Sequence, residues 1–309
     1  MKCFKYLLLL KVIVIGSHAS AQNIYSKAYG NKSNPHVIFI HGGPRGNSTL
    51  FEGTTAQTLA DKGFYVIVYD RLGEGRSADP NAKLTYEEAF EDLNTLITQY
   101  NLGKVNLIGH SFGGLVSTLY SKAYPEKVSN LILLGALFAQ QESYLHILDS
   151  CMTKAVEIND LAVQEDISMV RSLDTNSADF RKRTYEIASS FGFFKMPKPT
   201  PAAKKLQEEY SQSIFAETNI RNDEAPILFY ANETRLNIDT KRDLKDIKDQ
   251  GVLISAIYGM QDGIFSSKQL QDMRNIVDDA NFYAIDNCSH YPFVDQQKIM
   301  IDILKRVLR

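Results

Sequence analysis

The chain has 309 residues, of which 34 are Lys or Arg and 36 are Asp or Glu, so its formal net charge is −2. This near balance argues against nucleic-acid binding, which usually requires a clear excess of basic residues. Charged residues make up 23% of the chain and hydrophobic residues 44%, a composition typical of a globular protein rather than of a disordered or membrane-spanning one.

The N-terminal residues have the pattern of a secretory signal peptide. Two early lysines precede an apolar run at residues 7–15, and Ala19-Ser20-Ala21 matches the small-x-small motif of a cleavage site before Gln22. The run is too short for an ordinary transmembrane helix. Lys11 interrupts it, which leaves an uncleaved N-terminal anchor as the alternative. We expect residues 1–21 to be removed and the mature protein to be exported, periplasmic or secreted, without stable membrane insertion.

Short apolar runs bounded by glycine or other breakers predict β-strands buried on both faces. Helical patterns lie between them, as in the apolar residues at three- and four-residue steps from Tyr86 to Tyr100, where Thr85 and Glu88 form a predicted capping box. This alternation predicts an α/β fold with a mostly parallel central sheet flanked by helices. The predicted strands are Val37–Ile40, Tyr65–Tyr69, Val105–Ile108, Leu131–Leu134, Leu253–Tyr258 and Phe282–Ile285.

Residues 138–225 interrupt the alternation, because they contain helical patterns and no convincing strand. One pattern is the apolar stripe from Tyr144 to Val156. We expect this insertion to fold as a helical cap above the C-terminal ends of the strands, where α/β sheets bind their ligands. The predicted organisation is a signal peptide at 1–21, a first core segment at 22–137, the cap at 138–225 and a second core segment at 226–309.

The segment Gly109-His110-Ser111-Phe112-Gly113-Gly114 matches the G-x-S-x-G motif between a predicted strand and a predicted helix. The turn is so tight that the serine adopts strained dihedral angles, and a side chain at Gly109 or Gly113 would clash. Such a turn exposes the hydroxyl of Ser111 and aims the N–H of Phe112 at a developing oxyanion. Ser111 is therefore the predicted nucleophile; a glycine-rich helix start is the alternative.

A serine nucleophile needs a general base, and the base needs an orienting acid. In this type of site the chain order is Ser, then Asp or Glu, then His. Asp262 follows the strand predicted at 253–258, and His290 follows the strand predicted at 282–285, so both leave the same sheet edge as Ser111. Taken singly, Asp262 fits a turn and His290 a helix start; the ordered set predicts a catalytic triad.

The turn His41-Gly42-Gly43-Pro44 follows the first predicted strand. Backbone N–H groups in such a turn can supply a second oxyanion donor, and Gly43 is the predicted partner of Phe112; a purely structural turn is the alternative. Another glycine-rich segment, 73–78, imitates a dinucleotide-binding motif. Asp79-Pro80 follows it in place of a helix, so we exclude that function.

Residues from about 24 to 309 resemble the α/β-hydrolase superfamily. HGGP followed by D-R-x-G-x-G-x-S resembles most the proline iminopeptidase-type branch. The resemblance implies a serine peptidase that releases an N-terminal proline from short peptides, uses no cofactor and has a helical cap over its site. The motifs that carry it are HGGP at 41–44, YDRLGEGRS at 69–77, GHSFGG at 109–114, YGMQD at 258–262 and SHYPF at 289–293.

The chain departs from that branch in places. Arg45 replaces the glycine that usually follows HGGP, and His110 and Phe112 flank the nucleophile where the branch has Gly and Trp or Tyr. Arg45 can bind a substrate carboxylate or pin the cap through an acidic partner, with an exposed loop arginine as the simpler alternative. The resemblance also implies cap carboxylates for the substrate's amino group; Glu217 is the candidate, and a solvated glutamate is the alternative.

The sequence thus predicts an exported serine hydrolase that forms an acyl-enzyme. Aminopeptidase activity on short peptides is the first interpretation, a carboxylesterase or other small-molecule hydrolase the second, and a non-catalytic binding protein the third. The histidines show no metal-ligand spacing, so we expect no metal and no cofactor. The cysteines are too few for a disulfide framework. Export permits a disulfide between Cys151 and Cys288, whose pairing the sequence leaves open.

Overall fold

The computed structural model describes residues 24–308, so the predicted signal peptide lies outside the described residues. Its centre is a seven-stranded sheet with the order β1-β3-β2-β4-β5-β6-β7. β1 is antiparallel to its neighbour β3, and all other neighbouring strands are parallel. The strands are β1 (Ser26–Tyr29), β2 (His36–Ile40), β3 (Tyr65–Tyr69), β4 (Val105–His110), β5 (Val128–Leu134), β6 (Leu253–Gly259) and β7 (Phe282–Ile285).

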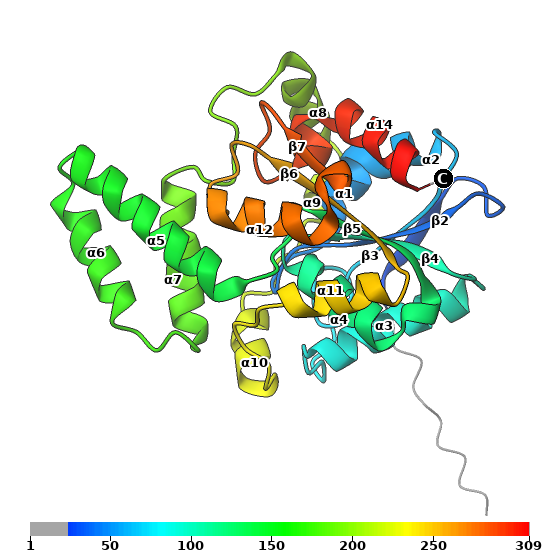
Figure 1. Ribbon diagram of the computed structural model, residues 1–309, viewed down its shortest axis with the longest axis horizontal. Coiled ribbons are helices and arrows are strands. Elements are labelled where there is room, and N and C mark those ends of the chain that lie inside the picture. The colour runs from blue at the N-terminus through cyan, green and yellow to red at the C-terminus, as the bar shows by residue number, and fades with distance from the viewer. Residues whose placement is uncertain (1–23, 309) are drawn as a thin grey trace, which may run out of the picture.

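Helices cover both faces of the sheet (Figure 1). On one face lie α3 (Tyr86–Gln99), α4 (Phe112–Ala123), α11 (Lys241–Asp249) and α12 (Ser267–Val277). On the other lie α1 (Thr49–Phe51), the π-helical turn η1 (Glu52–Ala56), α2 (Gln57–Ala60), α13 (Pro292–Asp295) and α14 (Gln297–Val307). Two short 3-10 turns, η2 (Pro125–Lys127) and η3 (Asp279–Asn281), precede β5 and β7.

Alternate residues of the buried strands face the two helical layers. In β2, Ile38 and Ile40 belong to the hydrophobic cluster that includes α3 and α4, whereas Val37 and Phe39 belong to the cluster that includes α1, α2 and α14. Phe39 stacks on Phe51 of α1 with 3.8 Å between the ring centroids. The two-residue period of a strand therefore buries both of its faces, which is why these strands read as continuous apolar runs.

The chain between β5 and β6 is helical. Before α11, its helices are α5 (Gln140–Glu157), α6 (Leu161–Arg171), α7 (Ala178–Ser190), α8 (Pro201–Ser211), α9 (Ile214–Glu217) and α10 (Ala225–Asn232). In Figure 1, α5, α6 and α7 pack on one another to the side of the sheet. The segment after α7 contacts the loops that follow β6 and β7, because Gly263 N–H donates to the carbonyl of Phe193 (3.1 Å) and the Ser289 hydroxyl donates to that of Phe194 (3.0 Å).

Where the elements differ from the prediction, the causes are local. The sequence pattern does not predict β1, which has no fully buried residue. The Glu88 N–H donates to the Thr85 hydroxyl (3.3 Å), but the Glu88 carboxylate binds two N–H groups upstream of Thr85, so the predicted capping box is only half formed. The amphipathic pattern of residues 294–308 predicts one last helix, but the chain divides into α13 and α14 at Gln296, whose φ is −140°. Val156, placed in the apolar stripe of α5, is 57% exposed.

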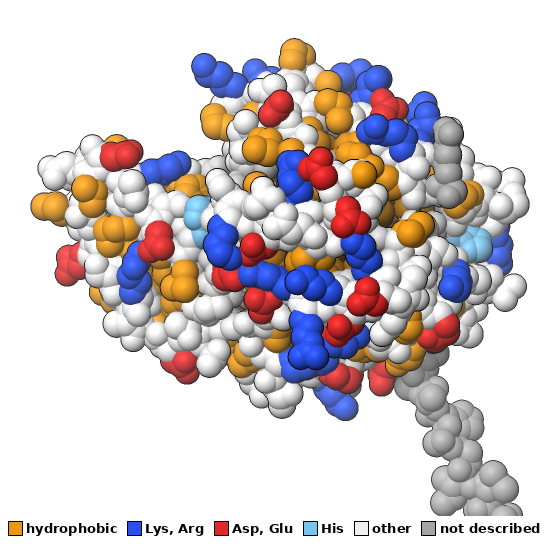
Figure 2. All heavy atoms as spheres, in the orientation of Figure 1, with side chains coloured by type: hydrophobic (Ala, Val, Ile, Leu, Met, Phe, Trp, Pro, Cys, Tyr) orange, Lys and Arg blue, Asp and Glu red, His pale blue; other side chains and the backbone are white. Residues whose placement is uncertain are grey.

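Positive and negative side chains are intermixed on the face of the molecule seen in Figure 2. Between α11, α12 and α5, Lys241 pairs with Asp272 (3.1 Å) and Glu142 (2.5 Å), and Lys248 pairs with Asp278 (2.6 Å). Such mixing leaves little net field of either sign there. No helix within residues 24–308 combines the length and the apolar character that crossing a bilayer requires.

One buried carboxylate on α3 is only partly paired. Asp92 is 1% exposed, and its Oδ2 accepts a hydrogen bond from Leu72 N–H (2.9 Å), while Oδ1 has no partner within residues 24–308. Burial raises the pKa of Asp92 to about 7. Between the ordinary aspartate pKa and that value, the unfolded chain has lost the proton while the folded chain keeps it. The free energy of unfolding therefore falls as pH rises through this window.

Replacing Asp92 by Asn should remove this pH dependence. We expect the stability of Asp92→Asn relative to the wild type to increase from pH 4 to pH 8 by up to roughly 4 kcal/mol, since the variant has no carboxylate to ionise. Urea unfolding at several pH values measures the difference. Glu91→Gln, which changes an exposed carboxylate on the same helix, is the control and should show a flat difference. A flat difference for Asp92→Asn would contradict the raised pKa.

Candidate active site

A sharp turn between β4 and α4 carries Ser111. Its φ of 53° and ψ of −122° lie outside the regions that L-residues normally adopt, and strain of this kind, of order 1–3 kcal/mol, is typical of functional sites. A Cβ atom at Gly109 would clash with Ser117, and one at Gly113 would clash with the carbonyl of Ile40. The glycines therefore allow the close approach of chain segments that makes this turn possible. Ser111 remains partly exposed.

His290 and Asp262 form a buried pair. Nδ1–H of His290 donates to Oδ2 of Asp262 (2.8 Å), and the two residues are 3% and 7% exposed. The other carboxylate oxygen of Asp262 accepts from Ile264 N–H (3.1 Å), so both oxygens have partners. The His290 carbonyl accepts a hydrogen bond from Nε2 of His110 (2.9 Å), the residue before Ser111. Burial holds the pKa of His110 well below its usual range, which keeps this ring neutral.

The end of β5 joins the two halves of the site. Ser111 N–H donates to the carbonyl of Leu134 (3.4 Å), and the Ser111 carbonyl accepts from Leu137 N–H (2.9 Å). A Cβ atom on Gly135, between them, would lie 3.6 Å from both Nδ1 of His290 and Oδ2 of Asp262. The predicted nucleophile, base and acid thus gather around one strand end, because parallel strands all end at the same sheet edge.

The turn after β2 lies against Ser111. A Cβ atom on Gly42 would stand 3.1 Å from Cβ and 3.6 Å from Oγ of Ser111. On the other side of the turn, Nη2 of Arg71 donates to the Gly42 carbonyl (2.9 Å). The C=O and N–H of a planar trans peptide point in opposite directions, so the N–H of Gly43 points away from Arg71. Gly43 remains the predicted oxyanion donor of this turn.

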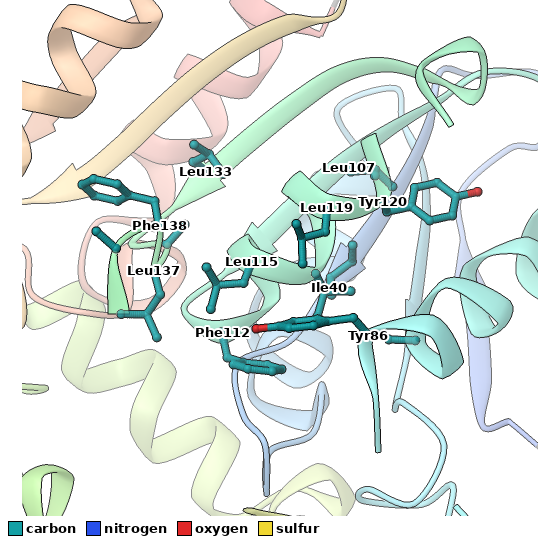
Figure 3. Close-up of a cluster of buried hydrophobic side chains, with 14 of the residues drawn as sticks. Ile40, Tyr86, Leu107, Phe112, Leu115, Leu119, Tyr120, Leu133, Leu137 and Phe138 are labelled. Carbon is teal, nitrogen blue, oxygen red and sulfur yellow. The ribbon is translucent and has the colours of Figure 1, made fainter. Parts of the chain in front are cut away.

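Phe112 opens α4, so its N–H is among those with no partner inside the helix. Its ring is 3% exposed and stacks on Tyr86 with 5.8 Å between centroids and 14° between planes. Figure 3 shows the Phe112 ring beside Tyr86 and Leu115. The guanidinium of Arg71 lies 5.4 Å from the ring centre. These contacts with Tyr86 and Arg71 hold Phe112 in place, and its backbone N–H is the other predicted oxyanion donor.

A buried ion pair that was not among the predicted site residues lies under the turn. Nε of Arg71 is 2.7 Å from Oε2 of Glu74, and the side chains are 3% and 2% exposed. Arg71 also donates to the carbonyls of His41 (2.6 Å) and Gly42 (2.9 Å). Burial and the nearby guanidinium lower the pKa of His41 to about 4. The neutral ring donates from Nδ1 to Gly42 and accepts the Arg71 N–H at Nε2.

Glu74 completes the arrangement from the other end. Its Oε1 accepts from the N–H groups of Arg45 (2.6 Å) and Gly46 (2.9 Å). A Cβ atom on Gly43 would clash with the Arg71 guanidinium. In the sequence, Glu74 lies within the glycine-rich segment at 73–78, and Arg71 lies two residues before it. Arg181 of α7 carries no sequence signal, yet its Nη2 donates to the Gly43 carbonyl (2.7 Å).

The two predicted substrate contacts lie further out. Arg45 forms an ion pair with Asp223 of the segment predicted as the cap, and the side chains are 45% and 72% exposed. This contact matches the cap-pinning alternative, although so exposed a pair contributes only about 0–1 kcal/mol. Glu217 ends α9, is exposed and forms no ion pair within residues 24–308. A role for either residue in substrate binding stays a prediction.

The cysteines do not pair. Cys151 and Cys288 are both free and buried. Burial raises the pKa of the Cys151 thiol to about 12, which keeps it protonated and unreactive at neutral pH. Within the described part of the chain, no group of three or more His, Cys, Asp or Glu side chains is arranged to hold a metal ion.

Comparisons with known proteins show which fold family the chain matches. Residues 35–297 match the family described as the alpha/beta hydrolase fold. A proline iminopeptidase of Clostridium botulinum is 22% identical over 293 residues, which cover 92% of this chain and 92% of that protein. A proline iminopeptidase of Saccharolobus solfataricus is 34% identical over 119 residues, but these cover only 37% of this chain and 38% of the relative.

Solved structures with the same fold include peptidases and esterases. The proline iminopeptidase of Mycobacterium smegmatis has a TM-score of 0.65 at 16% identity and covers 92% of this chain and 94% of its own. An esterase of Exiguobacterium antarcticum has a TM-score of 0.61 at 21% identity, with 92% and 95% covered. At these identities the similarity shows a shared fold only. The peptidase and esterase activities are those of the other proteins.

Removing Arg71 should destabilise the protein strongly, since Glu74 would be left buried without its partner. We expect Arg71→Met to lose about 3–5 kcal/mol of unfolding free energy, and the double variant Arg71→Met/Glu74→Gln to recover part of it. Arg274→Met, which breaks the exposed pair with Asp279, is the control and should lose no more than about 1 kcal/mol. Chemical denaturation compares them. Equal stability of Arg71→Met and Arg274→Met would refute the structural role of the buried pair.

Proposed function

The chain belongs to the α/β-hydrolase fold family, and from that premise we propose that it is an exported serine hydrolase that cleaves an ester or amide of a small molecule or short peptide. The observation that carries the proposal is the convergence of a strained, partly exposed Ser111 and the buried His290–Asp262 pair at one strand end. Export rests on the signal-peptide pattern of residues 1–21.

In the proposed reaction, the Ser111 hydroxyl attacks the substrate carbonyl while Nε2 of His290 takes its proton. Asp262 holds Nδ1–H of the ring and stabilises the imidazolium that forms. The tetrahedral intermediate collapses to an acyl-enzyme, and His290 returns the proton to the departing alcohol or amine. Water then attacks the acyl group with His290 again as base, and the acid product leaves with Ser111 regenerated.

The developing oxyanion accepts hydrogen bonds from the N–H groups of Gly43 and Phe112 in this proposal. Two features support the assignment. Arg71 holds the Gly42 carbonyl on the opposite side of the turn from the Gly43 N–H, and Phe112 lies at the N-terminus of α4, where N–H groups are unpartnered. Donors fixed in advance stabilise the transition state without reorganising during the reaction.

Aminopeptidase activity on an N-terminal proline is the first proposed substrate class. It is supported by the HGGP and D-R-x-G-x-G-x-S motifs and by relatives that are proline iminopeptidases. Carboxylesterase activity is the second. It is favoured by the position of Glu217, because the carboxylate predicted to hold the substrate's amino group is exposed at the end of α9.

Changing Ser111 to Ala should abolish covalent labelling by a fluorophosphonate probe and leave the fold intact, because alanine removes only the nucleophilic oxygen. Ser150→Ala is the matched control, since Ser150 also contacts a histidine, His146, at 3.3 Å; it should label normally. Labelling is read by intact-protein mass and folding by circular dichroism. A wild-type chain that does not label would favour the non-catalytic alternative, and labelling of Ser111→Ala would move the nucleophile elsewhere.

The substrate class follows from a pair of assays on the wild type. We expect prolyl β-naphthylamide to be hydrolysed with a higher kcat/KM than N-acetylprolyl β-naphthylamide, since an aminopeptidase needs the free amino group. p-Nitrophenyl butyrate serves as the ester substrate, and Ser111→Ala gives the background rate. Hydrolysis of the butyrate ester without cleavage of either prolyl substrate would replace the aminopeptidase by the carboxylesterase.

A further inference from the structure

Arg181 brings a positive charge from α7 to the turn that carries the proposed oxyanion donor. Its Nη2 donates to the Gly43 carbonyl (2.7 Å), one residue away from the Gly42 carbonyl that Arg71 binds. Arg181 is half-buried. A guanidinium has five N–H donors, so this bond leaves others available to a ligand.

No carboxylate among the described residues neutralises the charge of Arg181. Seven other arginines form ion pairs within residues 24–308, but no carboxylate lies within ion-pair distance of Arg181. Two of those seven, Arg45 and Arg71, also lie at this turn, and each already has its own carboxylate, Asp223 and Glu74 respectively. A partly buried cation without a counter-charge is costly to retain for structure alone.

The aromatic ring beside this cation carries a hydroxyl that has no partner within residues 24–308. The guanidinium carbon of Arg181 is 5.1 Å from the ring centre of Tyr185, one helical turn further along α7. The Tyr185 hydroxyl is buried and forms no hydrogen bond within residues 24–308. Burial raises the pKa of Tyr185, so the hydroxyl keeps its proton and can donate it to an anion.

Aromatic contacts connect these two groups with the proposed general base. The Tyr185 ring stacks on Phe194 with 5.8 Å between centroids, and Phe194 meets the ring of His290 edge-on at 5.5 Å. Arg181 therefore reaches Gly43 at one end of the reacting site, while the contacts of Tyr185 lead to His290 at the other. An anion held by the pair would lie close to the carbonyl that Ser111 attacks.

We propose that Arg181 and the hydroxyl of Tyr185 bind a carboxylate that the substrate carries beside the scissile bond. The proposal rests on the proposed serine-hydrolase function and narrows its substrates to anionic ones. If the substrate is a peptide, this carboxylate is the C-terminal carboxylate of a prolyl dipeptide. If it is an ester, it is the free carboxylate of a dicarboxylic acid monoester. A charge-assisted bond from a half-buried guanidinium gives the selectivity.

The alternative is that Arg181 only fastens α7 to the core through the Gly43 carbonyl. The two roles differ in what a substitution does to matched substrates. A fastening role affects neutral and anionic substrates equally. A carboxylate-binding role affects the anionic one selectively, by roughly tenfold to a hundredfold for one charge-assisted hydrogen bond.

The experiment compares the wild type, Arg181→Gln, Arg181→Lys and the control Lys182→Gln, which removes an exposed charge from the same helix. Their kcat/KM values are measured on two pairs that differ in the carboxylate: prolyl-glycine with prolyl-glycinamide, and monoethyl glutarate with ethyl valerate. Protection of Ser111 from fluorophosphonate labelling by free glutarate, with valeramide as the neutral comparison, reports binding without turnover. Thermal unfolding verifies that each variant is folded.

We expect the wild type and Lys182→Gln to prefer the anionic member and to be protected by glutarate. Arg181→Gln should lose both the preference and the protection while labelling and turnover of the neutral member persist, and Arg181→Lys should retain part of them. Equal losses on both members, unchanged protection in Arg181→Gln, or a wild type indifferent to the carboxylate would overturn the proposal. A wild type that neither labels nor hydrolyses any member would instead overturn the serine-hydrolase function.

Discussion

The buried ion pair between Arg71 and Glu74 determines how the rest of the site is arranged. Buried charges must be paired and hydrogen-bonded, and here the bonds that satisfy them are made to backbone groups of one turn. Arg71 donates to the carbonyls of His41 and Gly42, and Glu74 accepts from the N–H groups of Arg45 and Gly46. The turn therefore cannot rotate without leaving a buried charge unpaired, and its Gly43 N–H keeps a fixed direction.

The strained backbone of Ser111 depends on a similar constraint from the opposite side. Its N–H and carbonyl are both held by the chain at the end of β5, through Leu134 and Leu137. Parallel strands bring β4, β5, β6 and β7 to the same edge, so the loops that carry the serine, the aspartate and the histidine have no other place to meet. The glycines at 109 and 113 are required because any side chain there would collide with this packing.

Charge distinguishes this site from what the motifs alone imply. Three arginines, Arg45, Arg71 and Arg181, reach the turn after β2, and only the first two have carboxylate partners within residues 24–308. The described surroundings of the turn therefore include one guanidinium without a carboxylate partner. The helical segment between β5 and β6 supplies that guanidinium, so in our proposal it sets selectivity while the sheet and its loops supply the chemistry.

The sequence by itself determined the fold class, the six strands that appear as continuous apolar runs, and the residues that follow each of them. Buried strands and the glycines that end them are local patterns of the sequence. It did not reveal β1, whose half-exposed residues lack such a pattern. Only the tertiary structure decided which side chains meet: the 2.8 Å contact of His290 with Asp262, the partner of Arg45, and the approach of Arg181 to Gly43. These contacts join residues far apart in the chain, and their geometry depends on how the helices pack on the sheet.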